Sequence, residues 1–296
     1  MAVSAPTRRR AVTTLTAALA GAVAVPSYAR AAERKPGHSP LRRAHAHNDY
    51  EHPRPLLDAL SHGFTSVEAD IHLVDGQLLV AHDPAGLDPS RTLESLYLAP
   101  LAARVGADHG SVHRGYRRPV QLLIDIKTDG AATYPELHRQ LRRYRRMLST
   151  YAYGRVRPGA VTPVISGHRA ARAPMEAQRV RHAFYDGRLD DLAGPGAANP
   201  APASFIPLIS GNWTHSFTWQ GDGPFPAAER AKLHAVVSTA HRRGQRVRFW
   251  ATPDLPGPAR DAVWTELLAA DVDHVNTDDL AGLERFLRTY DRTRGA

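Results

Sequence analysis

The chain has 296 residues, of which 43% are hydrophobic and none is cysteine. This length suits one large barrel-type domain or two smaller ones, and the apolar content is sufficient for a sizeable core. The lack of cysteine excludes disulfides, thiolate metal sites and a lipid anchor on cysteine. The formal net charge is +9, but no nucleic-acid-binding motif accompanies it, so we expect no nucleic-acid partner.

The first 31 residues have the features of an export signal. A basic segment at residues 7–10 precedes an apolar, alanine-rich run at residues 11–25, and small residues follow at Ala29 and Ala31. The consecutive arginines predict the twin-arginine route, and therefore a secreted or cell-envelope protein. A membrane anchor is the alternative, although the run is shorter than the ~20 residues that a span needs. Removal of residues 1–31 takes away four arginines and no acidic residue, which lowers the formal charge from +9 to +5.

A polar linker is predicted at residues 32–40, and beyond it β-type runs alternate with helical patterns. The predicted strands are Leu41–His47, Thr65–His72, Val120–Lys127, Val161–Ser166, Val180–Tyr185, Ser204–Ser210, Arg246–Ala251 and Asp273–Thr277. The predicted helices are Arg54–His62, Thr92–Arg104, Tyr134–Tyr151, Pro226–Arg243, Ala259–Ala270 and Leu280–Tyr290. This alternation predicts an α/β fold in which a parallel sheet closes into a single-domain (β/α)8 TIM barrel over residues 41–296.

Two connecting segments carry turn signals. Asp75-Gly76 predicts a tight turn into a short hairpin arm at Gln77–Ala81, and the segment Gly194–Pro202 predicts a loop.

Three segments place two polar residues, separated by one spacer, at the end of an apolar run. Side chains at positions i and i+2 of a strand face the same side, so each pair points two ionisable groups in one direction. The carboxyl ends of TIM-barrel strands carry the active site. The three pairs are His45 and His47, Glu68 and Asp70, and Asp125 and Lys127. Further polar or aromatic groups at predicted strand ends or in the loops that follow are His82-Asp83, His168, Trp250 and Asn276.

The carboxylates of Glu68, Asp70 and Asp125 are expected to converge at the barrel mouth. Oxygen ligands suit a hard divalent cation, Mg²⁺ or Ca²⁺, which would also relieve the repulsion among the carboxylates. Imidazoles from the first strand and from His82 can supply general acid–base catalysis, and Lys127 can stabilise charge on phosphoryl oxygens. These groups predict metal-assisted transfer of a phosphoester or an ester.

The segments HAHNDY, SVEADIHLVDGQLLVAHD and LLIDIKT resemble the superfamily of barrel enzymes that contains glycerophosphodiester phosphodiesterase and phosphatidylinositol-specific phospholipase C. Sphingomyelinase D enzymes of spider venom belong to the same broader group. The resemblance covers His45 to Lys127 well and continues weakly at residues 248–250 and 275–278. It implies a phosphodiester or phospholipid substrate, a divalent ion held by Glu68, Asp70 and Asp125, acid–base roles for a first-strand histidine and His82, and a place for Lys127 near the phosphate.

The first strand departs from the family pattern. Glycerophosphodiesterases usually begin with His-Arg-Gly and carry Pro-Glu-Asn-Thr in the first loop, whereas this chain has His-Asn-Asp-Tyr at residues 47–50. It therefore resembles an HNDY-type branch, which leaves the glycerol-linked substrate open. We expect His47 to be the catalytic histidine because it lies nearest the strand end, beside Asn48, whereas His45 lies one layer deeper and is the alternative. The nucleophile is either a neighbouring substrate hydroxyl, which gives a cyclic phosphate, or water.

Several other side chains have predicted places. Asn48 and Trp250 are expected to contact substrate, whereas Trp213 and Trp219 either line the mouth or belong to the core. His72 shares the face of Asp70 but is expected in the outgoing loop. The arginines of the helix predicted at residues 134–151 form a solvated face or attract phosphate-bearing or membrane-surface partners, so peripheral membrane contact is possible for an otherwise monomeric protein.

Two other functions are compatible with the sequence. An amidohydrolase-type hydrolase would use His45 and His47 to bind zinc or a related ion, with His168, His182 and Asp278 as further ligands. That alternative leaves the Glu68/Asp70 and Asp125/Lys127 pairs without a function. A barrel that holds a phosphate-containing ligand without turnover is the second alternative.

Overall fold

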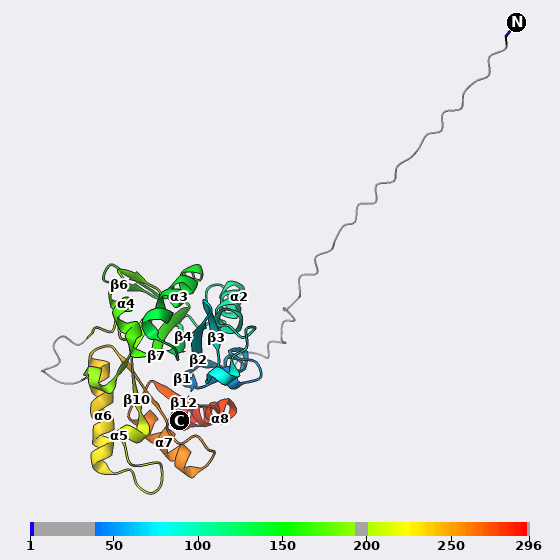
Figure 1. The fold of residues 1–296 in the computed structure, drawn as a ribbon. Helices are drawn as coiled ribbons and strands as arrows, with labels where there is room; N and C mark the ends of the chain where they lie inside the picture. Colours follow the sequence, from blue (N-terminus) through cyan, green and yellow to red (C-terminus); the bar gives the residue numbers. More distant parts are fainter. Residues whose placement is uncertain (3–38, 193–200, 295–296) are drawn as a thin grey trace. The chain divides into compact units, whose positions relative to one another are not determined.

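A computed structural model describes residues 1–2, 39–192 and 201–294 of the chain. The predicted export signal and linker lie almost entirely outside the described residues, and so does most of the predicted loop Gly194–Pro202. Every described helix and strand belongs to one compact unit (Figure 1). None of the described helices combines the length and the apolar character that a bilayer crossing requires.

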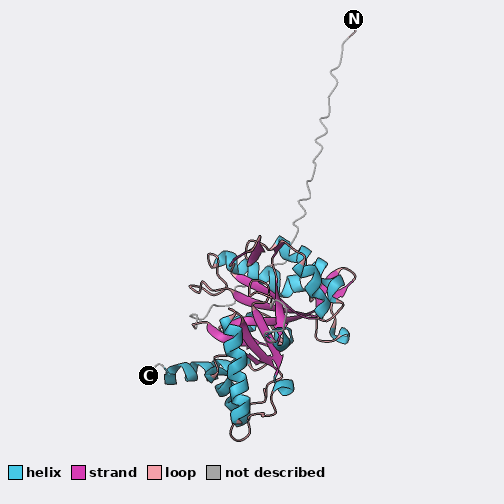
Figure 2. Cartoon of the chain, turned by 90° about the vertical axis from the view of Figure 1, so that its left-hand side faces the viewer, coloured by secondary structure: helices cyan, strands magenta, loops and turns pink. Residues whose placement is uncertain are grey.

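In the described part of the chain, eight parallel strands close into a barrel with helices on its outer surface (Figures 1 and 2). Strand β1 pairs with both β2 and β12, and this double pairing closes the sheet. The predicted (β/α)8 TIM barrel is therefore confirmed. The barrel strands are β1 (Leu41–Ala46), β2 (Phe64–Val74), β4 (Val120–Ile126), β7 (Val161–Gly167), β9 (Phe184–Arg188), β10 (Leu208–Asn212), β11 (Arg246–Trp250) and β12 (His274–Thr277).

The helices between the strands follow from local capping signals and apolar faces. In α3, for example, the Asp129 side chain accepts the Ala132 N–H, and Arg142 and Arg143 lie in the last turn, beside the negative end of the helix dipole. The α-helices are α1 (Leu57–Ser61), α2 (Ala99–Ala107), α3 (Gly130–Arg143), α4 (Arg172–Glu176), α5 (Trp213–Ser216), α6 (Ala227–Arg242), α7 (Pro258–Ala269) and α8 (Leu280–Arg294). Shorter helical segments are η1 (Asp49–Glu51), η2 (Pro84–Gly86), η3 (Glu94–Leu98), η4 (Arg169–Ala171) and η5 (Leu189–Leu192).

The predicted fifth strand, Val180–Tyr185, has the wrong boundaries. Val180–Arg181 forms β8, which belongs to a separate antiparallel sheet with β5 (Thr150–Ala152) and β6 (Arg155–Arg157). The barrel strand β9 begins at Phe184 and continues to Arg188. The guanidinium carbon of Arg181 lies 3.8 Å from the centroid of the Tyr151 ring, and this cation–π contact holds β8 against β5.

Other predicted boundaries also differ from the structure. The helix predicted at Tyr134–Tyr151 spans Gly130–Arg143 instead, a turn follows it, and β5 begins at Thr150 inside the predicted range. The strand predicted at Ser204–Ser210 begins only at Leu208, after Pro207, which has no N–H for a ladder. The helix predicted at Arg54–His62 is shorter in the structure, where only α1 (Leu57–Ser61) is helical. The helix predicted at Thr92–Arg104 is divided into η3 (Glu94–Leu98) and α2 (Ala99–Ala107).

The Asp75-Gly76 turn is confirmed, and it changes the place of His72. Both turn residues have positive φ, 47° and 76°, and they join β2 to β3 (Gln77–Val80), which pairs with it in antiparallel fashion. This hairpin extends β2 to Val74, so His72 lies inside the strand, buried and opposite Leu79, and not in the outgoing loop.

The interior of the barrel is largely polar, with an apolar cluster on the side of β4, β7, β9 and β10. Leu123, Val164, Phe184 and Leu208 form this small buried cluster. The polar side chains include His45, Ser66, Gln121, Arg246, Arg248 and His274. The larger apolar core lies between the strands and the helices. It includes Trp213 and Trp219, which belong to the core.

We predict that Leu123→Ala will lower the free energy of unfolding by about 2–5 kcal/mol, because it removes one of the few side chains that fill the apolar side of the interior. Urea denaturation of the purified variant measures this change. Leu255→Ala is the matched control, because Leu255 is 87% exposed and its loss should change stability by no more than ~0.5 kcal/mol. A loss at Leu123 as small as that of the control would contradict this description of the interior.

Candidate metal and acid–base site

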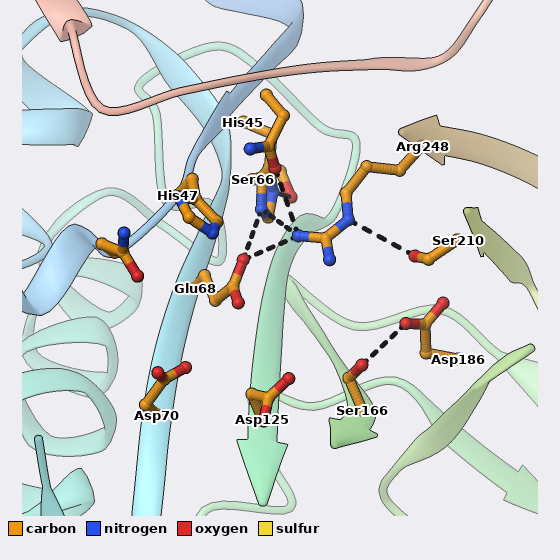
Figure 3. A network of polar contacts seen from close by, with 12 residues as sticks. His45, His47, Ser66, Glu68, Asp70, Asp125, Ser166, Asp186, Ser210 and Arg248 are labelled. Carbon is orange, nitrogen blue, oxygen red and sulfur yellow. Dashed lines mark hydrogen bonds and ion pairs between the residues drawn. The ribbon is translucent and has the colours of Figure 1, made fainter. Parts of the chain in front are cut away.

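Three carboxylates converge at the carboxyl ends of β2 and β4. Asp70 pairs in register with Asp125, and Glu68 lies one layer deeper on β2. One oxygen from each of Glu68, Asp70 and Asp125 lies within 4.8 Å of the other two. Figure 3 shows the three side chains along two adjacent strands. The predicted convergence of these residues is therefore observed.

The electrostatics of this triad favour a bound cation. The pKa of Asp125 is raised to about 6, chiefly by burial and also by the charges of Glu68 and Asp70, against an opposing effect of Lys127. Burial and the charge of Glu68 also raise the pKa of Asp70, whose Oδ1 is buried without a partner among the described residues. Three oxygen donors with an unsatisfied buried lone pair fit a hard divalent ion such as Mg²⁺ or Ca²⁺.

Lys127 supplies a positive charge directly to the triad. It follows β4, and its Nζ lies 2.9 Å from Asp70 Oδ2 and 3.2 Å from Asp125 Oδ1. Burial lowers the pKa of Lys127, but the two carboxylates raise it above its ordinary value overall. The ammonium group is therefore charged at neutral pH and lies where it can contact an anionic substrate beside the triad.

Arg248 reaches across the barrel from β11 to Glu68 on β2 (Figure 3). Its Nη1 donates to Glu68 Oε2 at 2.6 Å, and its Nε donates to Ser210 Oγ at 3.3 Å. Both members of this ion pair are almost fully buried, with side chains 4% and 6% exposed. Burial raises the pKa of Glu68, but the charge of Arg248 outweighs this effect and holds the pKa well below its usual range. Glu68 therefore enters the triad ionised.

His45 is enclosed in the same interior network. His45 Nε2 lies 2.7 Å from Arg248 Nη1, which can only donate, and 3.1 Å from Glu68 Oε2, which accepts only from a protonated ring nitrogen. On the other side of the ring, Nδ1 lies 2.7 Å from Ser66 Oγ. Burial and the charge of Arg248 lower the pKa of His45 to about 4, so the ring is neutral near pH 7. Its side chain has no exposed surface, so it cannot touch a substrate in this arrangement.

His47 lies at the rim of the barrel, just beyond β1, with 28% of its side chain exposed. Its Nδ1 lies 2.9 Å from Asp278 Oδ1, on the segment that follows β12. Burial lowers the pKa of His47, but the hydrogen bond to Asp278 and the charges of Glu68 and Asp278 raise it above 6.5 overall. Because Asp278 occupies Nδ1, Nε2 is the ring nitrogen that remains for proton exchange with a substrate.

Tyr50 joins Asn48, Asp70 and His82 in a second group of hydrogen bonds. Its hydroxyl lies 2.6 Å from Asp70 Oδ2, 2.7 Å from Asn48 Oδ1 and 3.2 Å from His82 Nδ1. Burial and the charge of Asp70 raise the pKa of Tyr50 far above its usual value, so the hydroxyl remains a donor. The side chain of His82 is 59% exposed, and its Nδ1 lies 3.2 Å from Asp70 Oδ2.

Asp49 fixes the loop that carries these residues. Its Oδ2 accepts the Leu56 N–H at 2.5 Å and the Tyr97 hydroxyl at 2.9 Å. Leu56 has a φ of 63°, an unfavourable left-handed conformation for a leucine, which this hydrogen bond helps to maintain. In the His-Asn-Asp-Tyr motif, His47 therefore supplies the imidazole at the rim, Asp49 holds the loop, and Tyr50 donates a hydrogen bond to Asp70 of the triad.

Sequence reasoning gave no role to Tyr50 or Arg248, and it missed a polar group at the end of β9. Asp186 is fully buried and accepts the Ser166 hydroxyl at 2.8 Å (Figure 3). It also forms an ion pair with Arg188 at 2.7 Å. Asp186 and Arg188 repeat the polar-spacer-polar pattern of the first three strands. The signal was present, but the predicted strand ended at Tyr185, one residue too early to reveal it.

The full ligand set of the amidohydrolase alternative does not come together, because Asp278 contacts His47 but His168 and His182 have other partners. His168 Nδ1 accepts the Gly130 N–H, and His182 Nδ1 lies 2.9 Å from Thr150 Oγ1, beside the small antiparallel sheet. Within residues 39–192 and 201–294, the triad is the only group of three or more metal-ligand side chains that converge.

Trp250 lies half-buried at the end of β11, where the sequence placed it. Its predicted contact with substrate stays a prediction.

We predict that Asp70→Asn and Asp125→Asn will each weaken binding of Mg²⁺ or Ca²⁺ by at least about 10-fold, because each removes an anionic oxygen from the triad. Isothermal titration calorimetry measures the affinity. Asp83→Asn is the control, because Asp83 is exposed and lies outside the triad. Affinity that stays unchanged in both triad variants would show that the ion, if bound, lies elsewhere.

Comparison with known proteins places this site in a family. The AIM6-like phosphodiesterase domain matches residues 39–186, and the glycerophosphoryl diester phosphodiesterase family matches residues 246–281. Altered inheritance of mitochondria protein 6 of Eremothecium gossypii is 30% identical over 278 residues, which cover 83% of this chain and 69% of that protein. Its homolog in Arthroderma benhamiae is 27% identical over 261 residues, which cover 80% of this chain and 81% of that protein. The chain therefore belongs to the AIM6-like phosphodiesterase family, within the glycerophosphodiester phosphodiesterase-like superfamily.

Proposed function

We propose that this protein is a metal-dependent phosphoric diester hydrolase that cleaves a glycerophosphodiester or a phospholipid headgroup. The observation that carries the proposal is the convergence of Glu68, Asp70 and Asp125 beside Lys127, with two exposed imidazoles, His47 and His82, at the same rim. The matching family descriptions agree with phosphodiester chemistry.

In the proposed reaction, each group of this site has a separate chemical role. A divalent ion held by the triad would supply Lewis acidity toward a phosphoryl oxygen. Lys127 would bind a second phosphoryl oxygen and offset the charge that grows there. His47 and His82 would exchange protons with the nucleophile and the leaving oxygen through their accessible nitrogens, one as base and the other as acid. Tyr50 would keep Asp70 and His82 in place through its hydroxyl.

In this proposal, the structure of the substrate decides which group acts as the nucleophile. A substrate with a hydroxyl next to the phosphate would form a cyclic phosphate, whereas a substrate without one would require water. Asn48, close to His47, and Trp250, at the end of β11, are the proposed contacts to the remainder of the substrate. Export and contact with a membrane surface remain part of the proposal.

A non-catalytic phosphate-binding barrel is the main competing function, since it would use the same residues. The exposure and proton-transfer geometry of His47 and His82 favour catalysis, because a passive binding site has no need for two reachable imidazoles beside a carboxylate triad. Incubation with a panel of phosphodiesters, with and without chelator, followed by phosphorus NMR, tests the proposal. Chelator-sensitive cyclic or linear products are expected, whereas a lack of turnover on every diester would favour the binding function.

We predict that His47→Ala and His82→Ala will each lower kcat on a chromogenic phosphodiester by about 10²–10⁴-fold, because each removes a proton-transfer group. His45→Ala should lower kcat less than His47→Ala does, and should chiefly lower the free energy of unfolding, because His45 lies wholly inside the barrel. The control is His234→Ala, an exposed position on α6. A larger rate loss for His45→Ala in a fully folded variant would reverse the assignment.

We predict that Asp278→Asn will move one limb of the pH–rate profile to lower pH. The Asp278 carboxylate raises the pKa of His47, so its removal must lower that pKa. If His47 acts as the acid, the alkaline limb moves, and if it acts as the base, the acidic limb moves. Initial rates across the pH range, with the wild type as reference, measure the shift. A profile with both limbs unmoved would contradict a proton-transfer role for His47.

A further inference from the structure

A second cavity lies at the amino-terminal end of the barrel, opposite the triad. It has a volume of about 720 Å³ and is lined by residues at or next to the starts of the barrel strands, among them Leu41, Thr65, Gln121, Thr162, Arg246 and His274. The triad lies at the carboxyl ends of the same strands. The two sites are therefore separated by the interior of the barrel, and the function proposed above does not use this cavity.

Arg246 forms part of the cavity and is held by neutral partners. Its Nη2 donates to Gln121 Oε1 at 2.7 Å, and its Nη1 donates to His274 Nε2 at 3.1 Å. Because Nε2 accepts, the proton of the neutral His274 ring is assigned to Nδ1, which is buried without a partner among the described residues. A partly buried guanidinium without a hydrogen-bonded carboxylate is costly, and an anion in the cavity would reduce that cost.

Two more arginines line the cavity and have no ion pair among residues 39–192 and 201–294. These are Arg42, whose side chain bonds to Tyr116, and Arg118, and both are exposed. Arg43 differs from them because it is already paired with Asp271 and donates to the Val272 carbonyl.

The acidic residues of the lining do not cancel this positive charge. Asp271 already forms an ion pair with Arg43. Asp273 lies close enough to stabilise Arg246 electrostatically, but its Oδ2 accepts hydrogen bonds from His241 and the Val247 N–H. Asp291 is the remaining acid of the lining. The lining therefore sets one further carboxylate beside three guanidinium groups, those of Arg42, Arg118 and Arg246.

The rest of the lining is largely apolar. Pro119, Val156, Pro158, Phe184 and Leu287 contribute to it. A ligand that fits this cavity would therefore combine a compact, strongly negative group with an apolar or aromatic part. Arginine forks match the oxygens of a phosphate, and a phosphate dianion offers enough charge and acceptors for more than one guanidinium.

We propose that this cavity is a second, non-catalytic binding site for a small organic phosphate monoester. The phosphate would lie against Arg42, Arg118 and Arg246, and the apolar part would lie against the proline, valine and leucine side chains of the wall. Phenyl phosphate is a suitable probe, since it carries a dianion on an aromatic ring and has no diester bond to cleave.

The test must spare Arg246 itself. Arg246, Gln121, Ser66 and His45 form a continuous series of hydrogen bonds through the interior, so loss of Arg246 would disturb folding as well as binding. Arg42 and Arg118 are exposed and can be replaced without opening the interior. Arg117 is also exposed, is adjacent in sequence and is absent from the cavity lining, so Arg117→Ala is the matched control.

Isothermal titration calorimetry of the full chain with phenyl phosphate, in the presence of chelator, is the experiment. We expect saturable binding that weakens at least about 10-fold, or 1.4 kcal/mol, in the Arg42→Ala/Arg118→Ala double variant. Arg117→Ala and the catalytic-site variant Lys127→Ala should bind like the wild type. Equal affinity in the double variant, or loss of binding in Lys127→Ala, would overturn the proposal, the latter because the probe would then occupy the catalytic site. Binding to anionic vesicles with none to phenyl phosphate would also overturn it, in favour of a lipid surface.

Discussion

The ion pair between Arg248 and Glu68 inside the barrel is the interaction on which the rest of the site depends. Arg248 is enclosed among Glu68, His45 and Ser210, so its charge has little access to water. Removing one member of a buried pair typically costs about 3–5 kcal/mol, because the other charge is left without compensation. The pair keeps Glu68 ionised and directed toward Asp70 and Asp125. Both members of the pair also contact His45 Nε2, and the charge of Arg248 adds to burial in lowering the pKa of His45.

The polar interior has consequences at both ends of the barrel. At the carboxyl ends of the strands, two buried carboxylates and one partly buried carboxylate meet one ammonium group, that of Lys127, and the pKa of Asp125 is raised first by burial and then by the charges of Glu68 and Asp70. At the amino-terminal ends, Arg246 faces a cavity with mostly neutral partners. One end is therefore suited to a cation and the other to an anion. The apolar cluster around Leu123 fills only the remaining side of the interior.

Much of this arrangement could be predicted from the sequence, because strand periodicity is a local property. Glu68, Asp70 and Asp125 follow apolar runs, and the rule that i and i+2 share a face places them together once the sheet is closed. The Asp75-Gly76 turn was predicted for the same reason. Contacts between distant strands were not predictable in this way. Arg248 is separated from Glu68 by 180 positions, and only the closed barrel brings their side chains together.

The misplaced fifth strand shows how a local error hides a site residue. Val180 and Arg181 have the composition of a strand and do form one, but in another sheet, where Arg181 contacts Tyr151. The true barrel strand carries Asp186 and Arg188 at its end, so an error of a few residues removed both from the candidate site. His72 was misplaced for a related reason, since the hairpin with β3 lengthens β2 beyond the point where the apolar run stops.

The most direct test of the central claim is an anomalous diffraction measurement on crystals of the wild-type protein grown with Mn²⁺. This ion replaces Mg²⁺ in oxygen-ligand sites and gives a measurable anomalous signal. Our account predicts a single strong peak coordinated by Glu68, Asp70 and Asp125, with Lys127 displaced from between the two aspartates. A map without a peak at the triad, in which Lys127 still bridges Asp70 and Asp125, would contradict it.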